Sequence, residues 1–170
     1  MIETLVVDGY NIIHAIPELE AKLDESLKSA RGALEKTLRQ YQATERSIKC
    51  AYVVYDSRRS EKNEIEIEDL GFVKNIYASS KSNADGEIVS LLKNIDRPAR
   101  VAVLSKDNFV INHTRIMGAH VLSVGAFHKK ITKHKRRTNE AKISEEQKEK
   151  ISEEQKEKIN QELKRIWAIK

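Results

Sequence analysis

The feature that most constrains the fold is an alternation between short apolar runs and segments with helical periodicity. Strand-like runs are predicted at 5–7, 48–56, 71–79, 99–107 and 119–125. Helices are predicted between them at 24–42, 82–95 and 108–118, with Asp24 able to cap the first. Strands that alternate with helices form a parallel sheet covered on both faces. We therefore expect a three-layer α/β/α domain with a mainly parallel sheet.

Chain length limits this to a single core. At 170 residues and 39% hydrophobic, the sequence supports one domain with an appendage. We expect the domain at 1–128, a basic connector at 129–139 and a helical extension at 140–170. The extension repeats ISEEQKEK at 143–150 and 151–158, and its charge pairs predict one long helix. A break near Ser152 stays open, because each copy begins with a Ser-x-x-Gln pattern that suits a helix cap.

Cysteine content and hydropathy indicate the cellular compartment in which the protein is expected. Cys50 is the only cysteine, so neither a disulfide framework nor a structural zinc site is expected. No apolar stretch approaches the 18 residues that would indicate a membrane-spanning helix. The N-terminal strand, with Glu3, also differs from a secretory signal. We expect a cytoplasmic protein with no membrane partner.

Positive charge is concentrated in one short segment. Residues 126–139 contain six Lys and Arg and no acid, whereas acidic and basic residues nearly balance in the rest of the chain. The six residues define the basic segment: Lys129, Lys130, Lys133, Lys135, Arg136 and Arg137. Such a cluster focuses positive potential and favours contact with a polyanion, for which RNA is the obvious candidate. A solvated connector has a similar composition and remains an alternative.

Acidic residues follow the predicted strands. Asp8, Asp56 and Asp107 each end one, and Asp85 opens a predicted helix. Because parallel strands end at the same edge of a sheet, where ligands bind in open α/β folds, we expect these carboxylates to lie near one another. Their mutual repulsion would raise their pKa values unless a cation neutralised them. Oxygen ligands of this kind suit Mg²⁺ or Mn²⁺.

Each of these residues also has a structural interpretation. Asp85 lies three residues after Ser82 in a capping pattern, and Asp107 can cap the helix that follows it. Asp56 can pair with the neighbouring arginines. Asn11 can orient a phosphate or a carboxylate, or close a turn after Gly9. Asp8 is harder to explain as a cap, because no regular helix is expected directly after it.

Three motifs together resemble a known family. VDGYNII at 7–13, the Ala-Asp pair at 84–85 and Ser-x-Asp at 105–107 resemble the YacP-like branch of the NYN-domain ribonucleases, within the PIN-like nuclease superfamily. The resemblance spans roughly residues 1–130. It implies an α/β/α fold and Mg²⁺- or Mn²⁺-dependent endonucleolytic cleavage of RNA. Asp8, Asp85 and Asp107 would then be the catalytic and metal-binding acids, with Asn11 in support. The branch is associated with translation and the ribosome.

Other function classes fit the sequence less well. Tyr10 stands where a haloacid-dehalogenase-type phosphatase would have its second Asp, and neither a G-x-G-x-x-G nor a Walker A motif is present, so no nucleotide cofactor is expected. We expect Arg58, Arg59 and Lys81, on loops near the acids, to contact RNA together with the basic segment. A non-catalytic RNA- or ribosome-binding module remains the alternative, and the oligomeric state stays open.

Overall fold

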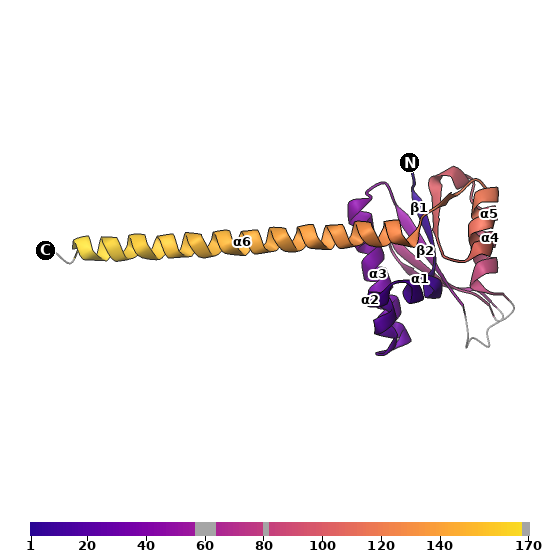
Figure 1. The fold of residues 1–170 in the computed structure, drawn as a ribbon, viewed down its shortest axis with the longest axis horizontal. Coiled ribbons are helices and arrows are strands. Elements are labelled where there is room, and N and C mark those ends of the chain that lie inside the picture. Colours follow the sequence, from indigo (N-terminus) through magenta and orange to yellow (C-terminus); the bar gives the residue numbers. More distant parts are fainter. Residues whose placement is uncertain (57–63, 80–81, 168–170) are drawn as a thin grey trace. The chain divides into compact units, whose positions relative to one another are not determined.

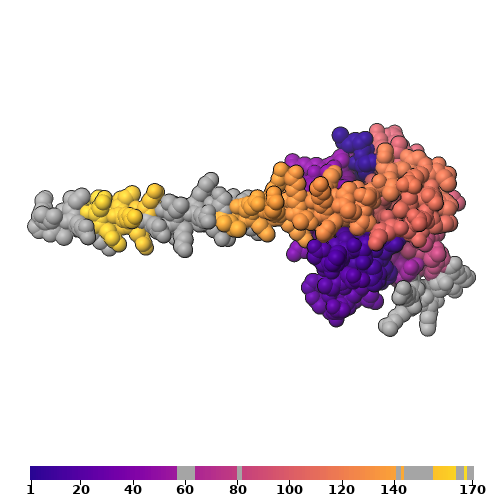
Figure 2. All heavy atoms as spheres, viewed as in Figure 1, coloured from indigo at the N-terminus to yellow at the C-terminus, as the bar shows by residue number. Residues whose placement is uncertain are grey.

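The structure, a computed structural model, describes residues 1–56, 64–79 and 82–167 (Figure 1). Arg58, Arg59 and Lys81 lie outside these ranges. Within the C-terminal helix, the side chains drawn in grey in Figure 2 are also left out of the description. The chain divides into two compact units, Met1–Ile131 and Thr132–Lys170. The first unit contains the sheet.

The sheet has six strands in the order β3-β4-β2-β1-β5-β6. Their bounds are β1 Thr4–Asp8, β2 Cys50–Tyr55, β3 Glu66–Leu70, β4 Val73–Tyr77, β5 Val101–Leu104 and β6 His120–Val121. The central strand β1 pairs in parallel with both β2 and β5. Only β3 runs antiparallel, at the edge beside β4. The expected mainly parallel α/β sheet is confirmed.

Helices cover both faces of this sheet (Figure 1). Their bounds are α1 Gly9–Ala15, α2 Pro17–Glu20, α3 Leu27–Thr44, α4 Ala84–Lys93 and α5 Asn108–Ile116, with 3₁₀ turns η1 Ala21–Leu23 and η2 Pro98–Arg100. Side chains of a strand alternate between faces, so Leu5 and Val7 join a core with α1 and α3, while Val6 joins a second core with α4 and α5. The two cores produce the predicted three layers.

Three element boundaries differ from the sequence prediction. The main helix α3 begins at Leu27 rather than near Asp24, because the Ser26 hydroxyl accepts a hydrogen bond from the Ser29 amide (3.0 Å) and caps it. The last strand, expected over 119–125, is only two residues long. A short helix, α1, begins directly after Asp8, where no regular helix was expected.

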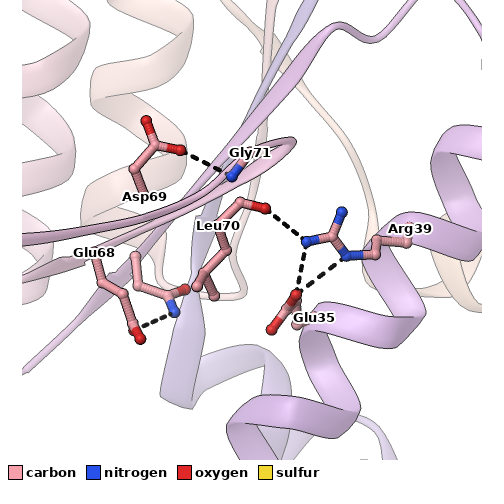
Figure 3. A network of polar contacts seen from close by, with 7 residues as sticks. Glu35, Arg39, Glu68, Asp69, Leu70 and Gly71 are labelled. Atoms are coloured by element: carbon pink, nitrogen blue, oxygen red, sulfur yellow. Dashed lines mark hydrogen bonds and ion pairs between the residues drawn. The ribbon is translucent and has the colours of Figure 1, made fainter.

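An antiparallel hairpin, β3–β4, closes one edge of the sheet and is tied to α3 (Figure 3). Gly71 turns the chain with φ +82, a left-handed conformation that favours glycine, and its amide donates to Asp69. Arg39 on α3 donates to the carbonyl oxygen of Leu70 (2.8 Å) and also bonds Glu35. The described part of the polar segment between β2 and β4 therefore forms an edge strand.

The last helix, α6, spans Val124–Trp167. Phe127 and Ile131, in its first turns, are buried in the core of the first unit. The residues expected as a basic connector, 129–139, are helical and belong to α6, and the helix runs unbroken through Ser152. Among the described residues, no helix is long and apolar enough to span a membrane.

Candidate acidic site at the carboxyl edge of the sheet

Three neighbouring strands bring polar residues to the carboxyl edge of the sheet. Asp8 is the last residue of β1, Asp56 follows β2, and Ser105 follows β5. Because β1 pairs in parallel with both other strands, the ends of all three lie side by side. This edge is where open α/β sheets bind their ligands. We call it the acidic rim.

Asp8 lies at the centre of the rim and is only 6% exposed. Its Oδ2 accepts a hydrogen bond from the Ser105 hydroxyl (2.9 Å), and the Ser105 oxygen in turn accepts from the amide of Asp107 (3.0 Å). Asp8 is the residue before α1, and its side chain lacks the geometry of a full capping bond, although the nearby backbone amide of Asn11 also lowers the pKa of its carboxyl. Ser105 thus provides the hydrogen bond that holds the carboxylate.

Asn11 and Asp107 fix the loop between β5 and α5. The Asn11 side-chain oxygen accepts a hydrogen bond from the amide of Lys106 (2.9 Å). The Asp107 Oδ1 accepts from the amides of Phe109 (2.7 Å) and Val110 (3.2 Å) and therefore caps α5. Asn11 thus joins α1 to the loop between β5 and α5, and Asp107 has the capping role that the sequence left open beside the catalytic one.

Asp85 and Asp56 meet at the start of α4. The N-cap of this helix is Asn83, whose side-chain oxygen accepts from the Gly86 amide (2.9 Å). A capping pair of Ser82 with Asp85 is therefore not what begins the helix. Asp56 instead reaches over from β2 and accepts a hydrogen bond from the amide of Ala84 (2.6 Å). Asp56 thereby anchors the turn that presents Asp85.

The pKa values show that the acids influence one another. Burial raises the pKa of Asp8 to about 6, opposed by the Ser105 hydrogen bond and reinforced by the charges of Asp85 and Asp56. Burial also raises the pKa of Asp85, with further contributions from the charges of Asp107 and Asp56. Burial is thus the main cause of both raised pKa values, and the neighbouring carboxylates add to it.

The carboxylate oxygens of the acidic rim suit a hard divalent cation, but the described residues do not form a complete coordination site. In the described part of the chain, no Lys or Arg forms an ion pair with any of the four aspartates. Among the same residues, no group of three His, Cys, Asp or Glu side chains is arranged to hold one ion. A cation here would be bound by one or two carboxylates and completed by water, as is common for Mg²⁺.

Comparison with known proteins identifies the family. The model of the YacP-like NYN domain matches residues 5–168, nearly the whole chain. The chain belongs to the YacP-like NYN family. The resemblance noted from the three sequence motifs is confirmed. NYN domains have a PIN-like nuclease fold, so family membership supports a ribonuclease-type function with RNA as the substrate class.

Solved structures of this fold are similar to the chain. Rae1 (YacP) from Bacillus subtilis is 25% identical, with a TM-score of 0.60 over 86% of this chain and 84% of that one. A tryptophan-to-leucine variant of Rae1 is 23% identical, with a TM-score of 0.66 over 84% of each chain, and shares the fold. No curated protein matches the chain.

The residues predicted to contact RNA have different surroundings in this NYN-family chain. Arg58, Arg59 and Lys81 fall outside the described residues. Lys130 of the basic segment forms an ion pair with Glu45 (2.5 Å) and lies over the ring of Tyr41, 5.8 Å from its centroid. The other members are all exposed on α6: Lys129, Lys133, Lys135, Arg136 and Arg137. Lys130 therefore pairs with a residue outside α6, whereas Arg136 pairs with Glu140 within that helix (3.3 Å).

Sequence reasoning overlooked Ser105 and the packing behind Gly9. The Ser-x-Asp motif carries a signal for Ser105, because a serine two residues before an acid can accept from the amide of that acid and donate to another carboxylate. A Cβ on Gly9 would lie 2.3 Å from the nearest Tyr55 ring atom, and Tyr55 itself packs between Tyr10 and Tyr77. The glycine of the VDGYN motif is thus required by a ring from β2.

Proposed function

We propose that this protein is a metal-dependent endoribonuclease that cleaves single-stranded RNA at the acidic rim. The observation that carries the proposal is the mutual influence of Asp8, Asp56, Asp85 and Asp107 at one sheet edge, where no Lys or Arg among the described residues pairs with them. Carboxylates that no cation neutralises destabilise a fold, so their presence on one edge favours a role in binding a cation. Family membership supports the same reaction class.

Asp8, Asp85 and Asp107 would supply the carboxylate ligands, one or two to each Mg²⁺ or Mn²⁺, and water would complete the coordination. A bound divalent cation lowers the pKa of a water ligand and stabilises negative charge on the phosphoryl group. Ser105 holds the Asp8 carboxylate in place, and Asp56 anchors the start of α4 beside Asp85. Asn11 positions the loop that precedes Asp107. Attack by water would leave a 5′-phosphate and a 3′-hydroxyl.

RNA affinity would come from basic residues outside the rim. We assign it to Arg58, Arg59 and Lys81 and to the basic segment, since phosphate contacts by Lys and Arg provide most of the affinity for nucleic acid. The domain at 1–128, the basic residues at 129–139 and the helical part at 140–170 would act together on cytoplasmic RNA. The association of the YacP-like branch with the ribosome makes messenger RNA under translation the substrate we propose, which cosedimentation with ribosomes would test.

The substitution Asp85→Asn distinguishes two roles for Asp85, that of a metal ligand and that of a first-turn residue that only stabilises α4. If Asp85 holds a cation, the variant should lose RNA cleavage in Mg²⁺ or Mn²⁺, and its rise in melting temperature on addition of Mg²⁺ should shrink, because ligand binding stabilises the folded state by mass action. In EDTA the variant should melt at the wild-type temperature or above it, because removing one charge relieves repulsion.

Glu87→Gln is the matched control, since Glu87 also lies in the first turn of α4. It removes the same favourable interaction with the helix dipole, about 0.3–1 kcal/mol, without touching the four aspartates. A protein that cuts RNA in EDTA, or an Asp85→Asn variant that keeps both its Mg²⁺ shift and its activity, would contradict the proposal. Metal-independent RNA binding without cleavage would favour the non-catalytic binding module.

A further inference from the structure

We infer that Phe109 and His113 on α5 form a stacking platform for a nucleobase of the RNA bound at the acidic rim. The inference deepens the function proposed above and rests on it for the position of the RNA. It assigns a ligand, an unpaired base, to two residues that have no part in the acidic chemistry.

Phe109 is an aromatic side chain on the surface of the domain. It is 52% exposed, whereas the ring of Tyr55 and that of Phe127 are almost completely buried. Its ring contacts the ring of His113, with the centroids 4.1 Å apart and the planes tilted by 44°. The His113 Nδ1 lies 2.8 Å from the carbonyl oxygen of Phe109, one helical turn earlier. The pair is therefore a preformed, partly exposed aromatic surface.

This surface lies beside the acids. The Phe109 amide donates to Asp107 Oδ1 (2.7 Å), so the aromatic residue belongs to the turn that Asp107 caps. Two residues span at most about 7 Å of backbone, which keeps the Cα atoms of Phe109 and Asp107 within that distance. A nucleotide whose phosphate lies at Asp107 would therefore have its own base, or a neighbouring one, within reach of the Phe109 ring.

The chemistry of the pair favours a base over other occupants. Every nucleobase has a π-face, and stacking on an aromatic side chain is the usual way in which proteins hold unpaired bases without reading their sequence. Lys106 and Arg115 flank the pair along the chain, as suits a ligand that carries phosphates. Stacking would fix the path of the strand at the rim and so select single-stranded RNA over a duplex.

The test is a thermodynamic cycle between Phe109 and single bases of the RNA. Affinity for a short single-stranded oligonucleotide is measured in EDTA, where no cleavage occurs, with each base in turn replaced by an abasic site. Wild type should lose roughly 5- to 150-fold in affinity at one or two positions. Phe109→Ala should lose a similar factor on the intact oligonucleotide and become insensitive to abasic sites at those positions.

Two further variants separate stacking from apolar contact. Phe109→Tyr keeps a π-face and should retain wild-type affinity, whereas Phe109→Leu keeps bulk without a π-face and should behave like the alanine variant. Ile116→Ala is the control, because Ile116 is 80% exposed on the same helix but about 10 Å farther along it. It should bind like wild type, and circular dichroism should show all four variants folded.

The outcomes distinguish this inference from the function on which it rests. If Phe109→Ala and wild type lose the same factor at every abasic position, or if Phe109→Leu binds like wild type, the stacking platform is refuted even where the enzyme cuts RNA. A second outcome is that abasic sites lower the affinity of wild type, but not that of Phe109→Ala, at particular positions, while wild type never cuts RNA with Mg²⁺ or Mn²⁺. This outcome would support the stacking platform and overturn the nuclease proposal.

Discussion

Ser105 donates a hydrogen bond to Asp8 across 97 residues of sequence, from the end of β5 to the end of β1. Its oxygen also accepts the amide of Asp107, so one hydroxyl links two of the candidate catalytic acids. The bond stabilises the ionised form of a buried carboxylate whose pKa is otherwise raised. Ser105 thereby controls both the position and the charge of Asp8.

Ser105→Ala should raise the pKa of Asp8 above its value of about 6, because the hydrogen bond that lowers it is lost. The pH profile of RNA cleavage should therefore shift to higher pH, and the free energy of unfolding should fall by about 1 kcal/mol. NMR titration of the Asp8 carboxyl carbon would measure the first effect. A serine that served only packing would lower stability and leave the titration in place.

Asp8→Asn should stabilise the metal-free protein at neutral pH. The pKa of Asp8 is about 6 in the fold, against an ordinary value of 3.8 for an aspartate. The native state therefore binds more protons between those values, and wild-type stability falls as the pH rises from about 4 to 6. The variant lacks this loss, which is worth at most about 3 kcal/mol. Urea unfolding in EDTA at pH 4.5 and pH 7 would measure it.

Asp69→Asn provides a control of opposite sign. The hydrogen bond from Lys74 lowers the pKa of Asp69, so its ionised form stabilises the fold, and that stability is lost as the pH falls through the lowered pKa. This variant should be less stable than wild type at pH 7 and equal to it in strong acid. An Asp8→Asn variant that is also less stable at pH 7 would contradict the crowded-carboxylate account of the rim.

Asp56 should anchor α4 through its hydrogen bond to the Ala84 amide. Two substitutions can distinguish this hydrogen bond from the effect of the negative charge. Asp56→Asn keeps an oxygen for the Ala84 amide, whereas Asp56→Ala leaves that amide without its 2.6 Å partner. We expect the alanine variant to lose about 1–2 kcal/mol and the asparagine variant much less. Hydrogen exchange of the first-turn amides of α4 should speed up only in the alanine variant. Equal exchange in both would show that charge, not anchoring, is what matters.

Gly9→Ala should be destabilising through Tyr55. The added Cβ would lie 2.3 Å from a ring atom of Tyr55, which is buried and cannot move freely. The cost should be about 1–3 kcal/mol, as for other overpacked cores. Gly32→Ala is the matched control inside α3, where a Cβ meets nothing within 4 Å and should stabilise by about 0.5–1 kcal/mol. Thermal melts of both variants would test this contrast.

The basic segment should determine how strongly RNA binding depends on salt. Replacing its five members other than Lys130 with Gln should flatten the log–log salt slope by roughly 3 to 4, if all five contact single-stranded phosphates. Lys130 is kept because it pairs with Glu45. The control neutralises an equal number of lysines elsewhere: Lys22, Lys28, Lys36, Lys49 and Lys93. The same slope in both variants would make the segment a connector only.

The acidic rim could be predicted from the sequence because it depends on strand direction. Where strands alternate with helices, the strands run parallel and their carboxyl ends lie at one edge of the sheet. An acid at the end of a strand can therefore be placed at this edge without any knowledge of side-chain packing. Asp8, Asp56 and Asp107 were placed at this edge in that way. The pKa values of Asp8 and Asp85 are raised as expected, but burial is the larger cause and the neighbouring carboxylates only add to it.

The contacts between distant segments could not be predicted in this way. The bond between Ser105 and Asp8, and the fit of Gly9 against Tyr55, depend on side chains brought together only by the folded sheet. The start of α3 was misplaced because Asp24 and Ser26 are both good capping residues, and the local pattern does not choose between them. Helix α1 was missed because Gly9 was read as a break.

The central position of β1 has a consequence for the order in which the protein can fold during its synthesis. Thr4 pairs with Val101 of β5, about 100 residues later, although β2 can pair much sooner. At common translation speeds of about 5–20 residues per second, β1 waits roughly 5–20 s for its second partner. Ser105 and Asp107 follow β5, so the acidic rim cannot assemble before that moment. A chain interrupted earlier has Asp8 without the groups that hold it.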